Sequence, residues 1–292
     1  MTEQPTHLRP VARAGVVGRF APSPTGDLHL GNLRTAMVAH EQCRRRGGLF
    51  IMRIEDLDAP RNVPGSESRI LEDLRWLGLD WDEGPDSGGP AGPYRQSERS
   101  VIYETALKTL EASGRIYYCT CSRRDLREAS APQGPEGPVY PGTCRGLDSG
   151  AQRAHPAGAA ARFVVETDPV VEFHDLLLGP QRFDLRTVCG DFVVRRRDGL
   201  WAYQLACAVD DALMGVTHVV RGADLLSSTP RQIAIMRALG LPVPQYMHVP
   251  LVADADGLRM SKRDGSLSVR ALRDRGLTPE EVRRLIFESP LL

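Results

Sequence analysis

Apolar residues near the start of the chain form two short runs, separated by a stretch with helical spacing. Residues 16–20 and 49–54 are runs of the kind that form buried β-strands. Between them, apolar positions recur with helical spacing from residue 30 to residue 46, and two glycines then end the pattern. A strand, a helix and a second strand make a βαβ unit, so the pattern predicts the beginning of a parallel, nucleotide-binding sheet.

The same alternation continues along the chain, with one interruption. We expect helices at residues 66–77, 99–113 and 230–239, strands near 162–165, 192–194, 218–220 and 249–252, and two short helices after residue 268. Between about residues 117 and 162 the composition changes to Pro, Gly, Ser and Ala with three cysteines, which indicates an inserted module. The predicted domains are the two halves of a catalytic domain at 14–116 and 196–267, an insertion at 117–195 and a tail at 268–292.

The overall charge argues against a protein that coats nucleic acid. The 292 residues include 37 basic and 37 acidic side chains, so the formal net charge is zero and any contact with RNA must be local. No apolar run approaches the ~20 residues needed to span a bilayer, and the residues before the first strand lack the apolar stretch of a signal peptide. We therefore expect a cytoplasmic protein without membrane contact. Only Lys108 and Lys262 among the basic residues are lysines, which draws attention to both.

Residues 19–32 place reactive side chains between the first predicted strand and the helix that follows. A turn of this kind leads into a helix N-terminus, where backbone N–H groups and the helix dipole favour phosphate. Gly26 and Gly31 let a nucleotide approach the backbone, and His29 would set a hydrogen-bond donor against a triphosphate. A lone histidine near a helix start is more often structural, so the interpretation depends on this context.

A second charged loop follows the last predicted strand and contains Lys262. A lysine ammonium on a loop can follow pyrophosphate as charge moves from the α-phosphate to the leaving group. Loops like this are usually only solvated. Here, however, the loop comes about 230 residues after the His29 turn, and the segments between them have the pattern of a parallel sheet. The two motifs in this order favour nucleotide chemistry.

These two motifs resemble the signatures of class I aminoacyl-tRNA synthetases, and more narrowly of the glutamyl branch. The run His29-Leu30-Gly31-Asn32 is similar to the HIGH signature, with Leu30 and Asn32 as departures. Residues 259–263 are similar to the KMSKS loop, with arginine at both ends around an intact Met260-Ser261-Lys262. The resemblance covers residues 16–268 and implies activation of an amino acid by ATP with Mg²⁺, with His29 and Lys262 catalytic. It also implies that ATP is bound by His29, Gly31, Asn32, Met260, Ser261 and Lys262.

The charged residues at the predicted strand ends suit glutamate as the amino acid. A substrate with two carboxylates and one ammonium requires two cations and one anion. Arg19, Glu55 and Arg221 each follow or end a predicted strand, and ligands bind at this edge of a parallel sheet. The alternative is three ordinary surface charges. The resemblance implies a glutamate site made of Arg19, Phe20, Ala21, Pro22, Ser23, Glu55, Tyr203 and Arg221.

The cysteines of the predicted insertion form a candidate zinc site. Cys119 and Cys121 are followed by Tyr140 and Cys144, and three thiolates leave tetrahedral zinc one ligand short. Tyr140 or solvent can supply the fourth ligand, and free cysteines are the alternative. The same spacing resembles a subfamily of glutamyl-synthetase-like proteins, so we expect Zn²⁺. The predicted fold is thus α/β: a Rossmann-like parallel-sheet catalytic domain with a small zinc-stapled insertion and a short helical C-terminal tail.

The acceptor follows from the resemblance and from the length of the tail. Only 30 residues follow Lys262, too few for the anticodon-binding domain of an ordinary glutamyl-tRNA synthetase. The chain resembles most the glutamyl-Q-tRNA(Asp) synthetases, a truncated branch that modifies queuosine in tRNA(Asp). We expect a monomer whose partners are L-glutamate, ATP and tRNA(Asp) bearing queuosine, and we expect adenylate formation to be independent of tRNA. Two alternatives stay open: a minimal glutamyl-tRNA synthetase that charges a tRNA 3′ end, and an idle paralogue that binds zinc. The expected RNA contacts are arginines 123, 124, 127, 145, 270, 273 and 275.

Overall fold

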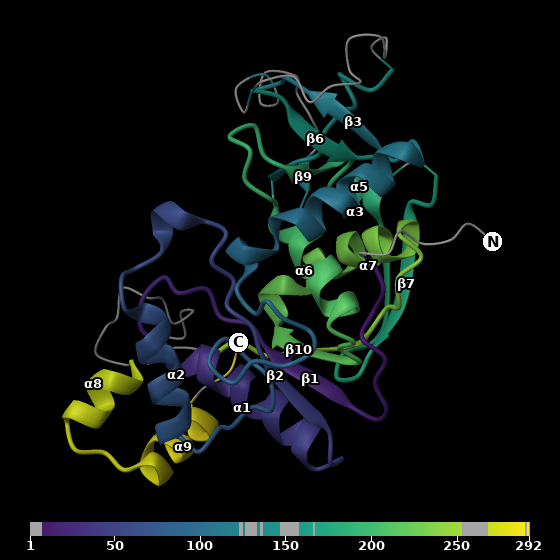
Figure 1. Cartoon of the computed structure of the whole chain (residues 1–292). Coiled ribbons are helices and arrows are strands. Elements are labelled where there is room, and N and C mark those ends of the chain that lie inside the picture. Colours follow the sequence, from purple (N-terminus) through teal and green to yellow (C-terminus); the bar gives the residue numbers. More distant parts are fainter. Residues whose placement is uncertain are drawn as a thin grey trace. The chain divides into compact units, whose positions relative to one another are not determined.

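The chain divides into two compact units, each built from segments far apart in the sequence. The computed structural model describes residues 8–122, 125, 133–134, 137–146, 158–165, 167–252, 268–289 and 291. The parallel-sheet unit comprises the described parts of residues 11–98, 215–225 and 244–292, and the cysteine unit comprises those of 1–10, 99–214 and 226–243 (Figure 1). The predicted domain boundaries at residues 117, 196 and 268 fall inside these segments and remain predictions.

The parallel-sheet unit begins with the predicted βαβ element. Its strands and helices are β1 (Val17–Phe20), α1 (Leu30–Arg44), β2 (Leu49–Met52), α2 (Ser66–Trp76), β10 (His218–Gly222), β11 (Gln245–Val249), α8 (Val269–Asp274) and α9 (Pro279–Glu288). β1 pairs with β2 in parallel, and β10 pairs with β11 in parallel. The apolar pattern therefore predicted the elements that build this unit's sheet, with one exception described below.

β1 lies between β2 and β10, so strands from the N-terminal and the C-terminal parts of the chain lie side by side. The N–H of Thr217 donates to the carbonyl of Val17 at 2.9 Å, and the N–H of Val17 donates to the Thr217 hydroxyl at 2.8 Å. Two residues along β1, the Arg19 side chain reaches the carbonyl of Val220, so β1 and β10 run in the same direction. All four residues of β1 are buried, as expected for a strand covered on both faces.

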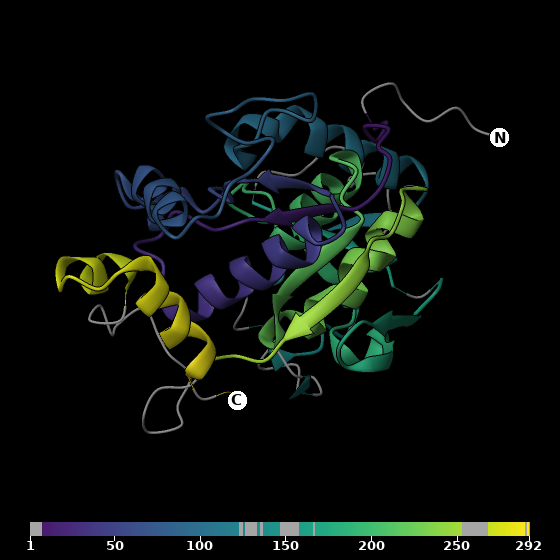
Figure 2. The same ribbon diagram turned by 90° about the horizontal axis from the view of Figure 1, so that it is seen from below.

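Helices cover this sheet and close its hydrophobic core. α1 packs on β1 and β10, and α9 packs on α1; in Figure 2 the yellow α9 lies against the purple α1. The shared core includes Leu33 of α1, Leu74 of α2, Leu272 of α8 and Ile286 of α9, each at most 2% exposed. The helices predicted after residue 268 are thus packed parts of this unit.

Among its described residues, the cysteine unit contains three sets of antiparallel strands and three longer helices. Its elements are α3 (Ser100–Ala112), β3 (Ile116–Cys119), β4 (Gln133–Gly134), β5 (Gly137–Pro138), β6 (Ala160–Phe163), β7 (Val170–Asp175), β8 (Gly179–Asp184), α5 (Leu185–Val188), β9 (Phe192–Arg195), α6 (Tyr203–Leu213) and α7 (Thr229–Ala238). β3, β6 and β9 form one antiparallel sheet, and β7 and β8 form a hairpin. Inside the unit, Asp210 of α6 accepts hydrogen bonds from Arg99 Nε at 2.6 Å and from the Tyr103 hydroxyl at 2.8 Å.

One strand lies earlier than predicted. The prediction of a strand at residues 249–252 is wrong, because the paired strand is β11, which ends at Val249. Pro250 follows directly and has no N–H to donate to a neighbouring strand, which suits a chain leaving the sheet. β11 contains polar residues, including His248, so it does not form the apolar run from which a strand is predicted. In the part of the chain that the structure describes, we found no helix with the length and apolarity needed to cross a membrane.

Candidate functional site

Two arginines lie at the carboxyl ends of neighbouring parallel strands. Arg19 is near the end of β1 and is 6% exposed, and Arg221 is near the end of β10 and is 3% exposed. Arg19 Nη1 donates to the carbonyl of Val220 at 3.1 Å, which ties its guanidinium to the residue directly before Arg221. Because both side chains are removed from water, they form a buried positive region that favours an anionic ligand.

A carboxylate stands at the end of the neighbouring strand. Glu55 follows β2, and its Oε1 accepts a hydrogen bond from Arg53 Nη2 at 2.9 Å. The backbone sets its place, because the N–H of Glu55 donates to the carbonyl of Pro22 at 3.0 Å and that of Arg53 donates to the carbonyl of Phe20 at 3.0 Å. The segment after β1 thus runs beside the segment after β2. The predicted substrate residues from Phe20 to Ser23 therefore lie along the same sheet edge as Glu55.

The Arg221 side chain is oriented by a histidine of β11. Arg221 pairs in register with His248, and its Nε donates to His248 Nε2 at 3.2 Å. Because arginine can only donate, His248 Nε2 must accept, which places the imidazole proton on Nδ1. The guanidinium carbon of Arg221 also lies 5.2 Å from the centroid of the Tyr246 ring. His248 is fully buried, so the orientation of Arg221 is fixed by the core.

His29 occupies the cap position of α1. Its Nδ1 accepts hydrogen bonds from the N–H groups of Gly31 at 3.1 Å and Asn32 at 3.4 Å. Backbone N–H groups only donate, so the neutral ring carries its proton on Nε2. A Cβ added at Gly31 would lie 3.1 Å from His29 Cε1, so glycine leaves the ring room to fold over the turn. The predicted ATP residues His29, Gly31 and Asn32 thus form one helix N-terminus, a geometry suited to phosphate.

The remaining predicted site residues belong to other segments of the chain. Tyr203 is the first residue of α6, is half-buried, and belongs to the cysteine unit. Met260, Ser261 and Lys262 lie outside the described residues, so their predicted contacts with ATP stay predictions. The described residues on either side of that segment, Val252 and Ser268, belong to the parallel-sheet unit.

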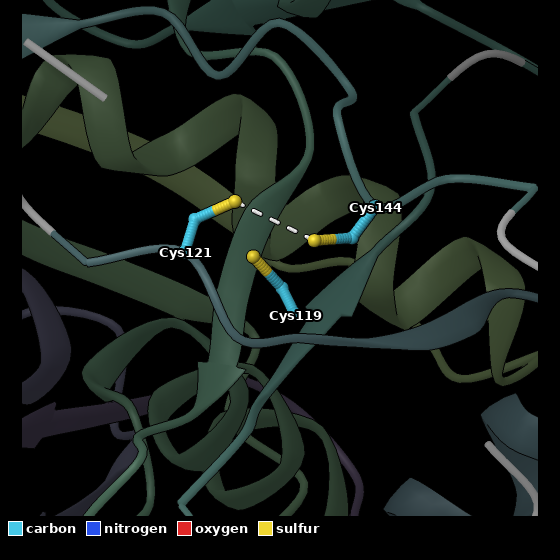
Figure 3. Close-up of side chains that lie close together, drawn as sticks. All are labelled: Cys119, Cys121 and Cys144. Carbon is cyan, nitrogen blue, oxygen red and sulfur yellow. Dashed lines mark hydrogen bonds between the residues drawn. The ribbon is translucent and has the colours of Figure 1, made fainter. Parts of the chain in front are cut away.

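Three sulfur atoms gather in the cysteine unit. Cys119 ends β3, and Figure 3 shows its Sγ turned toward those of Cys121 and Cys144. The three Sγ atoms lie within 4.8 Å of one another, and those of Cys121 and Cys144 are 3.4 Å apart. The Tyr140 hydroxyl oxygen is 3.3 Å from Cys119 Sγ and 3.9 Å from Cys121 Sγ. Zinc with bonds of about 2.3 Å to sulfur and about 2.0 Å to oxygen separates its ligands by roughly 3.5–3.8 Å, so this arrangement fits a tetrahedral ion.

The thiol environments also suit a metal. Burial alone would raise the pKa of Cys144, but hydrogen bonds with Tyr140, the backbone at Thr120 and Cys121 outweigh it and lower the pKa to about 7. Burial and the contact with Cys144 raise the pKa of Cys121 to about 11. One thiolate, that of Cys144, is thus available near neutral pH, and a bound cation would favour loss of the proton from Cys121.

Known proteins are similar to this chain in sequence and in fold. Residues 15–288 match the family described as tRNA synthetases class I (E and Q), catalytic domain. The chain belongs to this family. The synthetase is 55% identical over 271 residues to the glutamyl-Q tRNA(Asp) synthetase of Symbiobacterium thermophilum, across 91% of this chain and 83% of the relative. It is 49% identical over 269 residues to glutamate–tRNA ligase 2 of Alkalilimnicola ehrlichii, across 90% of this chain and 56% of the relative.

A solved structure agrees with the family assignment. The synthetase resembles the glutamate-tRNA synthetase of Elizabethkingia anophelis with a TM-score of 0.79 and 30% identity, across 94% of this chain and 61% of that chain. The predicted α/β class I fold is therefore confirmed. The chain spans little more than half the length of the glutamate–tRNA ligase relative.

Two residues at the synthetase's strand edge were not predicted from the sequence. Arg53 and His248 are each fully buried and contact Glu55 and Arg221, respectively. Arg53 is a charge inside an apolar strand end, and such a charge is rarely buried without a partner, so its position was a usable signal. His248 alternates with Tyr246 along β11, but a histidine in a short strand gives no comparable signal.

Proposed function

We propose that this synthetase activates L-glutamate with ATP and transfers the glutamyl group to the queuosine base in the anticodon of tRNA(Asp). The observation that carries the first half is the sheet edge, where two buried arginines lie near the ends of β1 and β10 and one carboxylate follows the end of β2. This charge pattern is complementary to glutamate, which has two carboxylates and one ammonium. Glutamine carries only one carboxylate and is expected to be a poor substrate.

The proposed activation step uses the strand-end residues, the His29 turn, Lys262 and Tyr203. Glu55 holds the substrate ammonium, and Arg19 and Arg221 hold its carboxylates, while ATP binds at the His29 turn with Mg²⁺ on its phosphates. A carboxylate oxygen of glutamate attacks the α-phosphorus, the bond to the bridging oxygen breaks, and pyrophosphate leaves with the electron pair. His29 Nε2–H and Lys262 stabilise the negative charge as it moves to the leaving group. In this proposal Tyr203 completes the glutamate site, and no tRNA is needed for activation.

The relatives support the choice of acceptor. The Symbiobacterium relative, named as a glutamyl-Q tRNA(Asp) synthetase, is more similar to this chain than the glutamate–tRNA ligase of Alkalilimnicola, at 55% against 49% identity. The second candidate function is charging of a tRNA 3′ end, which the 49% identity to that ligase favours. The two functions share the adenylate and differ only in the attacking nucleophile.

The metal in this proposal is structural. Cys119, Cys121, Tyr140 and Cys144 would hold Zn²⁺, which supplies cross-links within a loop-rich segment and takes no part in the transfer. Tyr140 also accepts a hydrogen bond from the N–H of Cys144 at 2.9 Å. The four groups are therefore held close together by the fold itself.

A charging assay separates the two functions. Purified protein, ATP and labelled glutamate are incubated with queuosine-containing tRNA(Asp), queuosine-lacking tRNA(Asp) and tRNA(Glu). We expect label only on the first, and we expect it to survive removal of the tRNA's 3′-terminal nucleotides. Label on the 3′ end of tRNA(Glu) would assign the second function. Glutamate-dependent ATP–pyrophosphate exchange without tRNA tests the activation step separately.

A further inference from the structure

A polar stripe on α2 lies against the turn that leads to His29. Ser66, Arg69 and Asp73 are three and four residues apart, so they share one face of the helix. Ser66 Oγ donates to the carbonyl of Gly26 at 2.7 Å and accepts from its N–H at 3.2 Å. One turn further along the helix, Arg69 Nε donates to Asp27 at 2.7 Å. The first two members of the stripe therefore hold the two residues that precede Leu28 and His29.

The third member connects the stripe to α8. Asp73 is fully buried, and Arg270 Nη2 lies 3.4 Å from its Oδ1; Figure 1 shows α8 beside α2. The same Arg270 nitrogen donates to Glu72 at 2.8 Å, whose side chain is 60% exposed. Neither oxygen of Asp73 has a hydrogen bond among the described residues. Such a carboxylate is costly to bury, so a role in stability alone does not account for it.

The start of α8 is joined to the His29 turn. Ser268 forms a β-bridge with His29, and the N–H of Val269 donates to the carbonyl of Leu28 at 3.2 Å. Val269 is fully buried in the core that also contains Leu28. A shift of α8 relative to α2 therefore moves the backbone that flanks His29.

We propose that Asp73 is a positioning residue, which holds the His29 turn in its phosphate-binding geometry through Arg270 and the first residues of α8. The role requires the carboxylate form, because a neutral side chain attracts Arg270 much less. This inference rests on the proposed ATP site at His29.

The charge of Asp73 changes in an accessible pH range. Burial raises its pKa to about 6, opposed by Arg270 and Arg273 of α8 and reinforced by Asp27 and by Glu72. Arg69, which pairs with Asp27, faces the same region from α2. Below pH 6 the wild type therefore comes to resemble a variant with a neutral side chain at this position.

The test compares Asp73→Asn with Glu72→Gln, which removes the exposed partner of the same arginine. Glutamate-dependent ATP–pyrophosphate exchange is measured from pH 5 to pH 8. For Asp73→Asn we expect the KM for ATP to rise roughly 3- to 30-fold at pH 8, with the difference from wild type vanishing near pH 5. Glu72→Gln should change it less than twofold. Arg270→Gln should reproduce the Asp73→Asn loss, and the double variant should lose no more than either single variant.

Two further measurements exclude a general loss of folding and keep the test independent of the activity. The melting temperature of Asp73→Asn at pH 8 should equal or exceed that of wild type, because a buried charge is removed. Hydrogen exchange of the Val269 amide should be faster in Asp73→Asn than in Glu72→Gln, whatever reaction the synthetase catalyses. Unchanged Val269 exchange, or a KM effect equally large at pH 5, would overturn the proposal.

Discussion

Replacing Arg221 by alanine should weaken glutamate recognition far more than ATP recognition. Arg221 is 3% exposed, so water cannot replace the lost guanidinium, and the substrate carboxylate would be left buried without its partner. Truncating one member of such a pair costs about 2–5 kcal/mol, which corresponds to a rise of roughly 30- to 4,000-fold in the KM for glutamate. The value should lie in the upper part of this range, because His248 and Tyr246 hold the guanidinium in place before the substrate arrives.

The assay is glutamate-dependent ATP–pyrophosphate exchange, with glutamate and ATP varied separately. Arg221→Lys keeps the charge but loses the planar fork and the Nε contact with His248, so an intermediate loss is expected. The matched control is Arg45→Ala, since the Arg45 side chain is 77% exposed and forms an ion pair with Glu41, four residues earlier. A KM for glutamate within threefold of wild type in Arg221→Ala, with the protein folded, would refute the assignment of Arg221 to the substrate carboxylate.

Four other outcomes are expected. Lys262→Ala should reduce pyrophosphate exchange by roughly two to three orders of magnitude while leaving glutamate binding, measured by calorimetry, nearly unchanged. Elemental analysis should find about one zinc per chain, and Cys119→Ser should abolish it; zinc-free protein with freely titrating thiols would contradict the site. Asp210→Ala should lower the free energy of unfolding in urea by about 3–5 kcal/mol because it strands the buried Arg99, whereas Glu172→Ala, at an ion pair with both side chains about two-thirds exposed, should change it by less than about 0.5 kcal/mol. The pKa of Asp73 is raised from 3.8 to about 6, so the native state binds its proton more tightly than the unfolded chain; wild-type stability should fall by about 2 kcal/mol from this group as pH rises from 4 to 6, and urea titrations of Asp73→Asn should lack that fall.

The sheet and the edge that carries Arg19, Glu55 and Arg221 could be predicted from the sequence because both depend on local patterns. The apolar runs that became β1 and β2 and the helical spacing of α1 are each visible within 20 residues or fewer. The rule that ligands bind at the carboxyl ends of parallel strands then brought Arg19, Glu55 and Arg221 to one edge without any knowledge of contacts. The cysteine spacing likewise predicted the cluster of Cys119, Cys121 and Cys144, whose sulfur atoms lie within 4.8 Å of one another.

The residues that escaped prediction depend on contacts between distant segments. Asp73 lies on a helix with several charged residues, and nothing nearby distinguishes it from a solvated side chain. Its neighbour in the structure is Arg270 of α8, a helix that begins almost 200 residues later. Arg270 also pairs with Glu72, from which it is separated by 198 positions. His248 likewise becomes informative only when β11 pairs with β10 and sets it opposite Arg221. Contacts between residues so far apart along the chain produce no periodic pattern in the sequence.

The position of β1 between two strands made from opposite parts of the chain has a consequence for synthesis on the ribosome. The hydrogen bond from Arg19 to Val220 spans 201 positions, so the sheet edge cannot assemble until β10 has emerged. At roughly 5–20 residues per second, β1 and β2 wait about 10–40 s for the strand that covers the open side of β1. During this interval the nascent chain exposes an unpaired, apolar strand edge, the kind of surface that invites wrong pairing. Chaperone demand should therefore be highest before residue 222 is translated. A ribosome that stalls in this interval holds a chain whose cysteine cluster is synthesised while the proposed glutamate site still lacks Arg221.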